Sequence, residues 1–305
     1  MIRAAALLYL SVATLSLPVA LAAPAHELSV AGWASARATH LSIQVDAYDA
    51  WRGSGPAVLQ NIARLLPQGA AGIGVVCQVG EQSIDVITDQ GGHARCELKT
   101  TGAVKVSLVS GEEVRPNIPS LPDAPVTVIS DLDDTVLITG AGKRSSVSTF
   151  LGATVSNRAA FPDIAPLYNS FAARGYPLVY LSNSPLGLSD FLRSVLPARG
   201  IANGPLLLRA LDAQTLLHST QHKIQSLNEL AADLPGQFLL IGDTAQKDPE
   251  VYTAFAQSHP GKVLGIAIRD VSGPPRSQDV ATLLYTAGVP VIISADAAAF
   301  ASLVR

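Results

Sequence analysis

Short apolar runs alternate with longer amphipathic stretches throughout the second part of the chain. The apolar runs are Val126–Ile129, Leu178–Leu181, Leu206–Leu208, Phe238–Ile241, Val263–Ile268 and Val291–Ile293. The stretches with helical periodicity lie near 163–174, 187–197, 222–233, 247–258, 277–287 and 296–304. Continuous apolar strands separated by helices predict an α/β fold, with a Rossmann-like, doubly wound parallel sheet covered by helices on both faces. Functional side chains are then expected at the carboxyl ends of the strands.

Residues 26–119 follow a different pattern, in which short strand-like runs recur between turn signals. These runs are Leu41–Val45, Ile73–Val79, Ser83–Ile87, Ala94–Leu98 and Val104–Val109, with the turn sequence Asp89–Gly92 between two of them. Regularly spaced short strands predict a small β-sandwich. Residues 56–66 are expected to form a helix or a long loop within it.

Four prolines between Pro116 and Pro125 indicate a linker, because proline lacks an N–H donor and restricts its neighbours. We therefore place a domain boundary near residue 120, which gives domains at 26–119 and 120–305. A chain of 305 residues with 48% apolar residues has enough material for two packed cores. The net charge is −3 and no basic run is present, which argues against nucleic-acid binding.

The N-terminus has the features of a secretory signal peptide. Arg3 precedes an uncharged apolar run that ends in the small-residue sequence Ala20-Leu21-Ala22. We expect cleavage after Ala22, so that residues 1–22 are removed and the protein is exported to the periplasm or secreted. The alternative is an uncleaved membrane anchor, but the run is short for a span and contains Pro18.

Two cysteines, Cys77 and Cys96, lie in the N-terminal part of the chain. Export to an oxidising compartment favours a disulfide between them. The alternative is a pair of buried thiols.

Three carboxylates follow the first apolar run of the second domain, at Asp131, Asp133 and Asp134. Like charges this close raise one another's pKa unless a cation neutralises them. An ordinary acidic turn is the alternative, but such a turn rarely needs so many acids at a strand end. We therefore expect a cation here.

Four further positions carry candidate site residues, two at the same predicted sheet edge and two at helix starts. Ser182 follows the strand Leu178–Leu181, and Gly242-Asp243 follows the strand Phe238–Ile241. Lys223 stands near a helix start, where the helix dipole disfavours a cation unless an anion lies nearby. Asp248 begins the next helix, where capping and support of a metal site are both open interpretations.

These motifs resemble, in order and in position, those of the haloacid dehalogenase superfamily. Asp131-x-Asp133-x-Thr135 resembles its first motif and Gly242-Asp243 with Asp248 its fourth, while Ser182 and Lys223 fit the second and third by context. A closer resemblance is to the catalytic domain of actin-patch-protein type phosphatidate phosphatases, a lipin-related branch. The segments that carry it are Ile129–Val136, Tyr180–Pro185, Gly204–Arg209, His222-Lys223, Leu240–Glu250 and Ile268–Val271. Thr244 stands where this branch has serine, which leaves the expected mechanism unchanged.

The resemblance implies a phosphatase with Asp131 as its nucleophile. Asp131 would attack phosphorus to form an aspartyl-phosphate. Asp133 would protonate the leaving oxygen and then activate water. Ser182 and Lys223 would stabilise the equatorial phosphate oxygens.

The same resemblance implies Mg²⁺ as cofactor. The side chains of Asp131 and Asp243 and the backbone carbonyl of Asp133 would be its protein ligands, which suits the preference of Mg²⁺ for oxygen. Asp248 would orient either metal-bound waters or Lys223.

Residues 137–160, which include Lys143 and Arg144, are expected to form a flap or minimal cap. A small cap leaves the site open to a bulky phosphorylated substrate, and the resemblance favours a lipid headgroup such as phosphatidate, with possible peripheral contact to a membrane. Two alternatives stay open: a phosphatase for soluble phosphate monoesters, and a non-catalytic module that binds a lipid or a partner.

Overall fold

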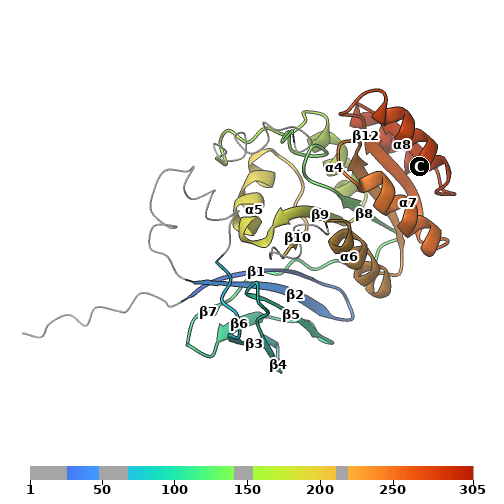
Figure 1. Cartoon of the computed structure of the whole chain (residues 1–305). Coiled ribbons are helices and arrows are strands. Elements are labelled where there is room, and N and C mark those ends of the chain that lie inside the picture. Colours follow the sequence, from blue (N-terminus) through green and yellow to red (C-terminus); the bar gives the residue numbers. More distant parts are fainter. Residues whose placement is uncertain (1–25, 48–67, 141–153, 211–218, 305) are drawn as a thin grey trace, which may run out of the picture.

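The second part of the chain forms a six-stranded parallel sheet, as predicted (Figure 1). The computed structural model of the protein describes residues 26–47, 68–140, 154–210 and 219–304. The order of the strands is β10-β9-β8-β11-β12-β13. Their bounds are β8 (Val126–Ser130), β9 (Leu178–Pro185), β10 (Leu206–Arg209), β11 (Gln237–Asp243), β12 (Val263–Arg269) and β13 (Val291–Ser294). The strand order reverses at β8, which puts the carboxyl end of β8 at the switch point where ligands of such sheets bind.

Helices cover both faces of this sheet. On one face lie α4 (Ile164–Ala173), α5 (Ser189–Ala198) and η3 (Ala297–Leu303), and on the other lie α6 (Ser219–Asp233), α7 (Asp248–Ser258) and α8 (Arg276–Tyr285). Alternate strand residues feed the two cores: Val128 and Tyr180 belong to the first, Ile129 and Val179 to the second. This two-sided burial explains the unbroken apolar runs in the sequence.

Two of the predicted helical segments differ in detail from the structure. The last one is a 3-10 helix, and it starts where the side chain of Asp296 accepts a hydrogen bond from the N–H of Ala298. The segment predicted near 187–197 divides into a 3-10 turn, η1 (Leu186–Leu188), and α5. Short 3-10 segments of this kind are common at the ends of helices and in connections.

The N-terminal part contains two antiparallel sheets that contribute to one hydrophobic cluster. The first sheet has the order β1-β2-β5 and the second β4-β3-β6-β7. Their bounds are β1 (His26–Ala34), β2 (Thr39–Ala47), β3 (Gly74–Val79), β4 (Gln82–Ile87), β5 (His93–Leu98), β6 (Val104–Leu108) and β7 (Glu113–Val114).

The sequence pattern did not predict β1. Val30 packs in the N-terminal cluster, whereas Ala31 and Trp33 pack in the two clusters of the parallel-sheet domain. A strand that is buried on both faces shows no alternation of apolar and polar residues, which is why this segment lacks the usual strand signal.

Cys77 and Cys96 form a disulfide, as predicted. Cys77 lies in β3 and Cys96 in β5, so the bond joins the two antiparallel sheets. Both side chains are buried in the shared cluster. The disulfide therefore cross-links the N-terminal unit through its core.

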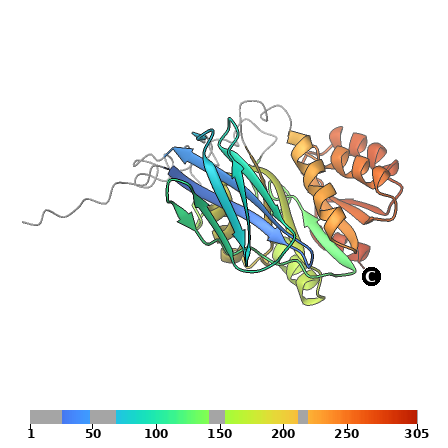
Figure 2. The same ribbon diagram turned by 90° about the horizontal axis from the view of Figure 1, so that it is seen from below.

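The sheet β1-β2-β5 lies against the parallel-sheet domain, as the view from below shows (Figure 2). At the end of α6, the Asp233 carboxylate accepts a hydrogen bond from Ser35 Oγ at 3.0 Å, and His40 Nε2 lies 2.8 Å from the same oxygen. Arg37 donates to the backbone carbonyl of Asp233. The N-terminal unit thus holds the carboxyl end of α6.

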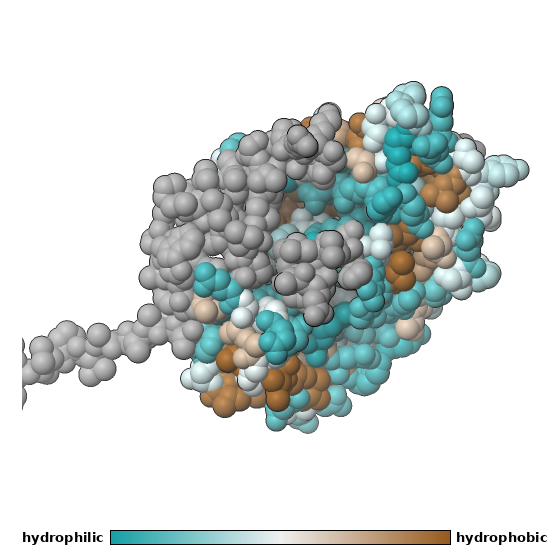
Figure 3. Space-filling view, viewed as in Figure 1, coloured by the Kyte–Doolittle hydropathy of each residue, from teal (hydrophilic) through white to brown (hydrophobic). Residues whose placement is uncertain are grey.

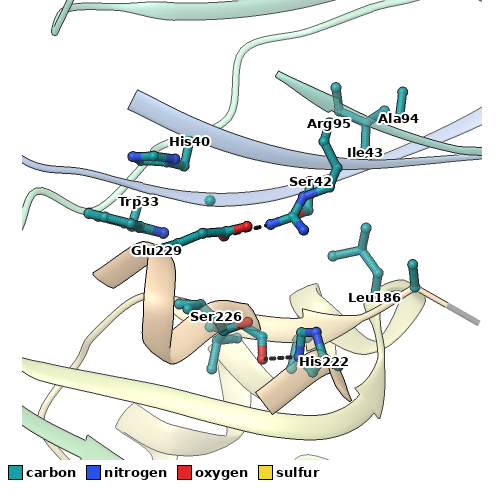
Figure 4. Close-up of a pocket in the computed structure, with 15 residues that line it drawn as sticks. Trp33, His40, Ser42, Ile43, Ala94, Arg95, Leu186, His222, Ser226 and Glu229 are labelled. Atoms are coloured by element: carbon teal, nitrogen blue, oxygen red, sulfur yellow. Dashed lines mark hydrogen bonds and ion pairs between the residues drawn. The ribbon is translucent and has the colours of Figure 1, made fainter. Parts of the chain in front are cut away.

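A small cavity of about 60 Å³ lies at this interface (Figure 4). Arg95 on β5 forms a 2.7 Å ion pair across it with Glu229 on α6. Trp33, His40 and Ser42 line it from the sheet, and Leu186, His222 and Ser226 line it from the other domain.

Several predicted features fall outside the described residues: the signal peptide at 1–22, the segment 56–66, and Lys143 and Arg144 of the expected flap. Within the described part of the chain, no helix has both the length and the apolar character needed to cross a membrane.

Candidate active site

The acidic turn after β8 begins at a fully buried carboxylate. Asp131 is 0% exposed, and its N–H donates to the carbonyl of Ile241 in β11 at 2.8 Å. This hydrogen bond continues the pairing of β8 with β11 beyond the last ladder position. Because both strands run parallel, Asp131 and Asp243 leave the sheet side by side.

Lys223 joins two of the predicted acids. Its Nζ lies 2.7 Å from Asp131 Oδ1 and also donates to Asp248 Oδ1. All three side chains are almost completely buried. Burial raises the pKa of Asp131 well above its usual value, against the opposing effect of Lys223. Burial lowers the pKa of Lys223, but the two carboxylates outweigh this, so the net pKa lies above its usual value and the lysine stays cationic.

Asp243 and Asp248 are packed against each other at the start of α7. Asp248 Oδ2 accepts the backbone N–H of Asp243 at 3.3 Å. A Cβ on Gly242 would lie 2.5 Å from the Cβ of Asp248, so only glycine permits this approach. Burial, and next the charge of Asp248, raise the pKa of Asp243 to about 7. With Asp248 Oδ1 on Lys223, both oxygens of Asp248 are engaged by protein donors.

Three oxygens of this group converge on one point, and that convergence fits a small cation. Gln246 Nε2 lies 3.4 Å from Asp131 Oδ2, 2.9 Å from the backbone carbonyl of Asp133 and 3.3 Å from Asp243 Oδ2. These oxygens are the same three that the resemblance implies as magnesium ligands. Two carboxylates and a carbonyl form an all-oxygen set of the kind that Mg²⁺ prefers. Oxygens of Asp131, Asp243 and Asp248 also lie within 4.8 Å of one another.

The side chain of Asp133 lies at the edge of this group and is 20% exposed. Its Oδ2 accepts hydrogen bonds from Ser182 Oγ at 3.2 Å and from Ser184 Oγ at 2.9 Å. The guanidinium of Arg158 lies 3.6 Å from its other oxygen. Ser182, predicted as a phosphate-binding residue, therefore contacts Asp133 and lies beside the acidic group.

Asp134 shapes the turn that follows the acids. It has a positive φ of 61°, which is uncommon for any residue other than glycine. Its Oδ1 accepts the backbone N–H groups of Thr139 and Gly140 at 2.8 and 2.6 Å. Through these two hydrogen bonds Asp134 stabilises the turn.

Residues at the two ends of the predicted flap run side by side. Leu137 pairs with Ala160, and the N–H of Ile138 donates to the carbonyl of Ala159 at 3.0 Å. Next to this pairing lies an open cavity of about 600 Å³, lined in part by Ile138, Phe161 and Val271. Asp134 and Ala245, neighbours of the site in sequence, also line it.

The guanidinium of Arg269 is buried beneath this cavity. It forms hydrogen bonds of 2.9 and 3.2 Å with the two oxygens of Asp163 and lies 4.1 Å over the ring of Phe161. It also donates to the backbone carbonyls of Thr135 and Ala295. Arg269 therefore connects the turn after β8 to the end of the sheet.

The structure brings all the predicted site residues together: Asp131, Asp133, Ser182, Lys223, Asp243 and Asp248. Sequence reasoning missed Gln246, Arg158 and Ser184. Gln246 and Ser184 lie within the segments that carry the family resemblance, and that position was the available signal. Arg158 had no such signal, because it comes from the far end of the predicted flap.

Residues 126–270 match the protein-family model described as "Phosphatidate phosphatase APP1, catalytic domain". Among curated proteins, phosphatidate phosphatase APP1 of Saccharomyces cerevisiae is 29% identical over 153 residues, which make up 47% of this chain and 26% of the yeast protein. The chain thus spans about a quarter of the length of this relative.

Two solved structures are similar to parts of the chain. The class C acid phosphatase from Bacillus anthracis has a TM-score of 0.33 at 18% identity, over 56% of this chain and 66% of that one. The Pnkp1/Rnl/Hen1 complex has a TM-score of 0.31 at 17% identity, over 44% and 46%.

Proposed function

We propose, from the match of residues 126–270 to the catalytic-domain family of phosphatidate phosphatase APP1, that the chain is a magnesium-dependent phosphatase that acts through an aspartyl-phosphate on Asp131. The observation that carries the proposal is the convergence of Asp131, the Asp133 carbonyl and Asp243 on one point. A bound cation would screen the charge of the phosphate from the attacking carboxylate.

In the first step, a carboxylate oxygen of Asp131 forms a bond to phosphorus while the bond from phosphorus to the ester oxygen breaks. Asp133 gives its proton to the departing oxygen, so that the alcohol leaves neutral. In the second step, Asp133 as carboxylate takes a proton from water, whose oxygen attacks phosphorus and releases Asp131 and inorganic phosphate. The partly exposed position of Asp133, at the edge of the group, suits both proton transfers.

The cationic Lys223 has two roles in this proposal. It holds Asp131 by the 2.7 Å hydrogen bond to Oδ1, and its charge stabilises the equatorial phosphate oxygens together with the Ser182 hydroxyl. Asp248, whose oxygens hold Lys223 and the N–H of Asp243, orients the lysine.

We propose a lipid phosphate as the substrate, with phosphatidate as the first choice because of the family. The open cavity beside the site, with Ile138, Phe161 and Val271 in its lining, offers room for part of a bulky substrate. A soluble phosphate monoester is the second candidate. On the face shown in Figure 3, apolar residues form separate small groups among hydrophilic ones. We propose that contact with a membrane, if the substrate is a lipid, is peripheral.

We also propose that the protein is exported, with residues 1–22 as its signal peptide, and that residues 26–119 form a β-sandwich. The Cys77–Cys96 disulfide supports the first point, because disulfides persist in oxidising compartments. The shared cluster of the two antiparallel sheets supports the second. Fractionation of cells that produce the full chain would test export: recovery in the cytoplasm with an intact N-terminus would contradict it.

Phosphate release from phosphatidate in detergent micelles, compared with a panel of soluble monoesters, tests the function. We expect release that needs Mg²⁺, is lost with a chelator, and falls at least a thousandfold in Asp131→Asn. Asp279→Asn, at an exposed position of α8, is the matched control and should keep full activity. Activity that survives Asp131→Asn would refute the nucleophile. Release from soluble esters alone would refute the lipid substrate. If the folded protein binds phosphatidate but hydrolyses no ester, its function is that of a non-catalytic binding module.

A further inference from the structure

The amide nitrogen of Gln246 lies at the point that the three candidate ligand oxygens share. It is 2.9–3.4 Å from Asp131 Oδ2, the Asp133 carbonyl and Asp243 Oδ2. All three neighbours are acceptors, so the nitrogen of the amide, and not its oxygen, must face them. A primary amide has two N–H donors, which these three oxygens share.

An amide nitrogen and a cation cannot occupy this position at the same time. Mg²⁺ binds oxygen at about 2.0–2.1 Å, whereas the three oxygens lie 2.9–3.4 Å from the nitrogen. The oxygens must therefore close in by about 1 Å around the ion, and the amide must leave.

The backbone of the loop that carries Gln246 is held in place. Arg276 donates to the carbonyl of Thr244 at 3.0 Å and to that of Gln246 at 3.1 Å. The N–H of Gln246 donates to Asp243 Oδ1 at 2.9 Å. The residue is also partly exposed, so its side chain can turn towards solvent while the loop stays where it is.

We propose that Gln246 is a positioning residue that gathers the three ligand oxygens before the cation binds and that the cation displaces. This inference rests on the proposed function, since it assumes that the three oxygens ligate the ion. It assigns to Gln246 two linked effects. The amide relieves repulsion between the carboxylates in the metal-free protein, and it weakens cation binding because its hydrogen bonds must first be broken.

Calorimetric titration of the full chain with Mg²⁺, and thermal unfolding with and without the ion, test the inference without reference to activity. We expect Gln246→Ala to bind Mg²⁺ about tenfold more tightly than the wild type, because a charge-assisted hydrogen bond no longer competes. The metal-free variant should melt several degrees lower, and Mg²⁺ should raise its melting temperature by more than that of the wild type. Gln246→Met, which keeps the length of the side chain, should show the same directions.

Gln257→Ala is the control, because Gln257 bonds only Thr286 at the exposed side of α7 among the described residues. It should leave the affinity for Mg²⁺ unchanged. Equal or weaker binding by both Gln246 variants would overturn the inference, since the side chain would then be a bystander or a ligand. If the wild type binds no Mg²⁺, the proposal that this site holds the ion is wrong. That result would be a failure of the proposed function, and it is visible before any variant is made.

Discussion

Replacing Lys223 by methionine removes the positive charge between two fully buried carboxylates. Among the described residues, Lys223 is the only cation bonded to Asp131 and Asp248, and both acids are 0% exposed. Breaking a buried ion pair from one side costs about 3–5 kcal/mol, because the remaining charge is left without compensation. Lys223→Met should therefore be strongly destabilising in the metal-free protein.

The loss of stability in Lys223→Met is limited by the protonation of one of the two carboxyl groups. The cheapest response is for one carboxyl to bind a proton when the protein folds. With an unfolded pKa near 3.9, this costs roughly 4 kcal/mol at pH 7 but only about 1.5 kcal/mol at pH 5. The folded-state pKa of that carboxyl is raised, so the stability of the variant falls as pH rises from about 4 towards that value. The loss should thus shrink by more than half between pH 7 and pH 5.

Urea unfolding with a chelator present, at pH 5 and pH 7, measures both numbers. Lys247→Met is the matched control, since its side chain is 64% exposed and pairs only with Glu250 among the described residues. It should change the free energy of unfolding by less than about 0.5 kcal/mol at either pH. A loss below about 1 kcal/mol for Lys223→Met at pH 7, or a loss that does not depend on pH, would refute the argument. Added Mg²⁺ should restore part of the stability, because the ion supplies the missing positive charge.

Three further predictions concern the frame of the site. Burial lowers the pKa of His222 from 6.5 to about 4, so the stability that the neutral imidazole contributes is complete above pH 6.5 and declines towards pH 4. The free energy of unfolding should fall by about 2 kcal/mol at pH 5 from this group. Urea titrations in which His222→Gln loses as much stability between pH 7 and pH 5 as the wild type would contradict this. The double variant Cys77→Ser with Cys96→Ser should lose about 3 kcal/mol of its free energy of unfolding, since the disulfide closes a loop of 19 residues in the unfolded chain. An unchanged urea midpoint would contradict this stabilisation. Asp163→Asn should cost about 3 kcal/mol, because the guanidinium of Arg269 is 2% exposed and loses its carboxylate partner; thermal unfolding that differs by less than 1 kcal/mol would show that the pair does not stabilise the fold.

The parallel sheet and the acids at its edge could be predicted because their signals are local. Each strand of that sheet is a continuous apolar run, and Asp131 and Asp243 follow directly after such runs. Neighbouring parallel strands bring their carboxyl ends together, so sequence position alone predicts that these acids meet. The same logic failed for β1, whose residues pack in three different clusters and so show no period of two.

The direction of individual side chains could not be predicted in the same way. Gln246 points at the ligand oxygens because Asp243 Oδ1 accepts two backbone N–H groups and folds the loop back over the site. Arg158 reaches Asp133 only because the two ends of the flap pair with each other. For Asp248, position in the sequence leaves capping and metal support both open, and the structure shows its oxygens holding Lys223, one of the two roles that the resemblance implies, and the N–H of Asp243. The contacts of Arg158 and Asp248 are tertiary, and no local sequence pattern encodes them.

The hydrogen bonds from the N-terminal unit to Asp233 mean that the region of homology is smaller than the region that must fold together. The family match covers 126–270, yet the helix that carries Lys223 ends in a residue whose partners are Ser35, Arg37 and His40. The core on the other face of the sheet also draws Ala297 and Phe300 from beyond the match. A fragment cut at the limits of the family would lose both supports. Experiments on this protein should therefore use a chain that runs from β1 to η3. Substitutions at Ser35 or His40 are expected to shift the position of Lys223, although neither residue touches it.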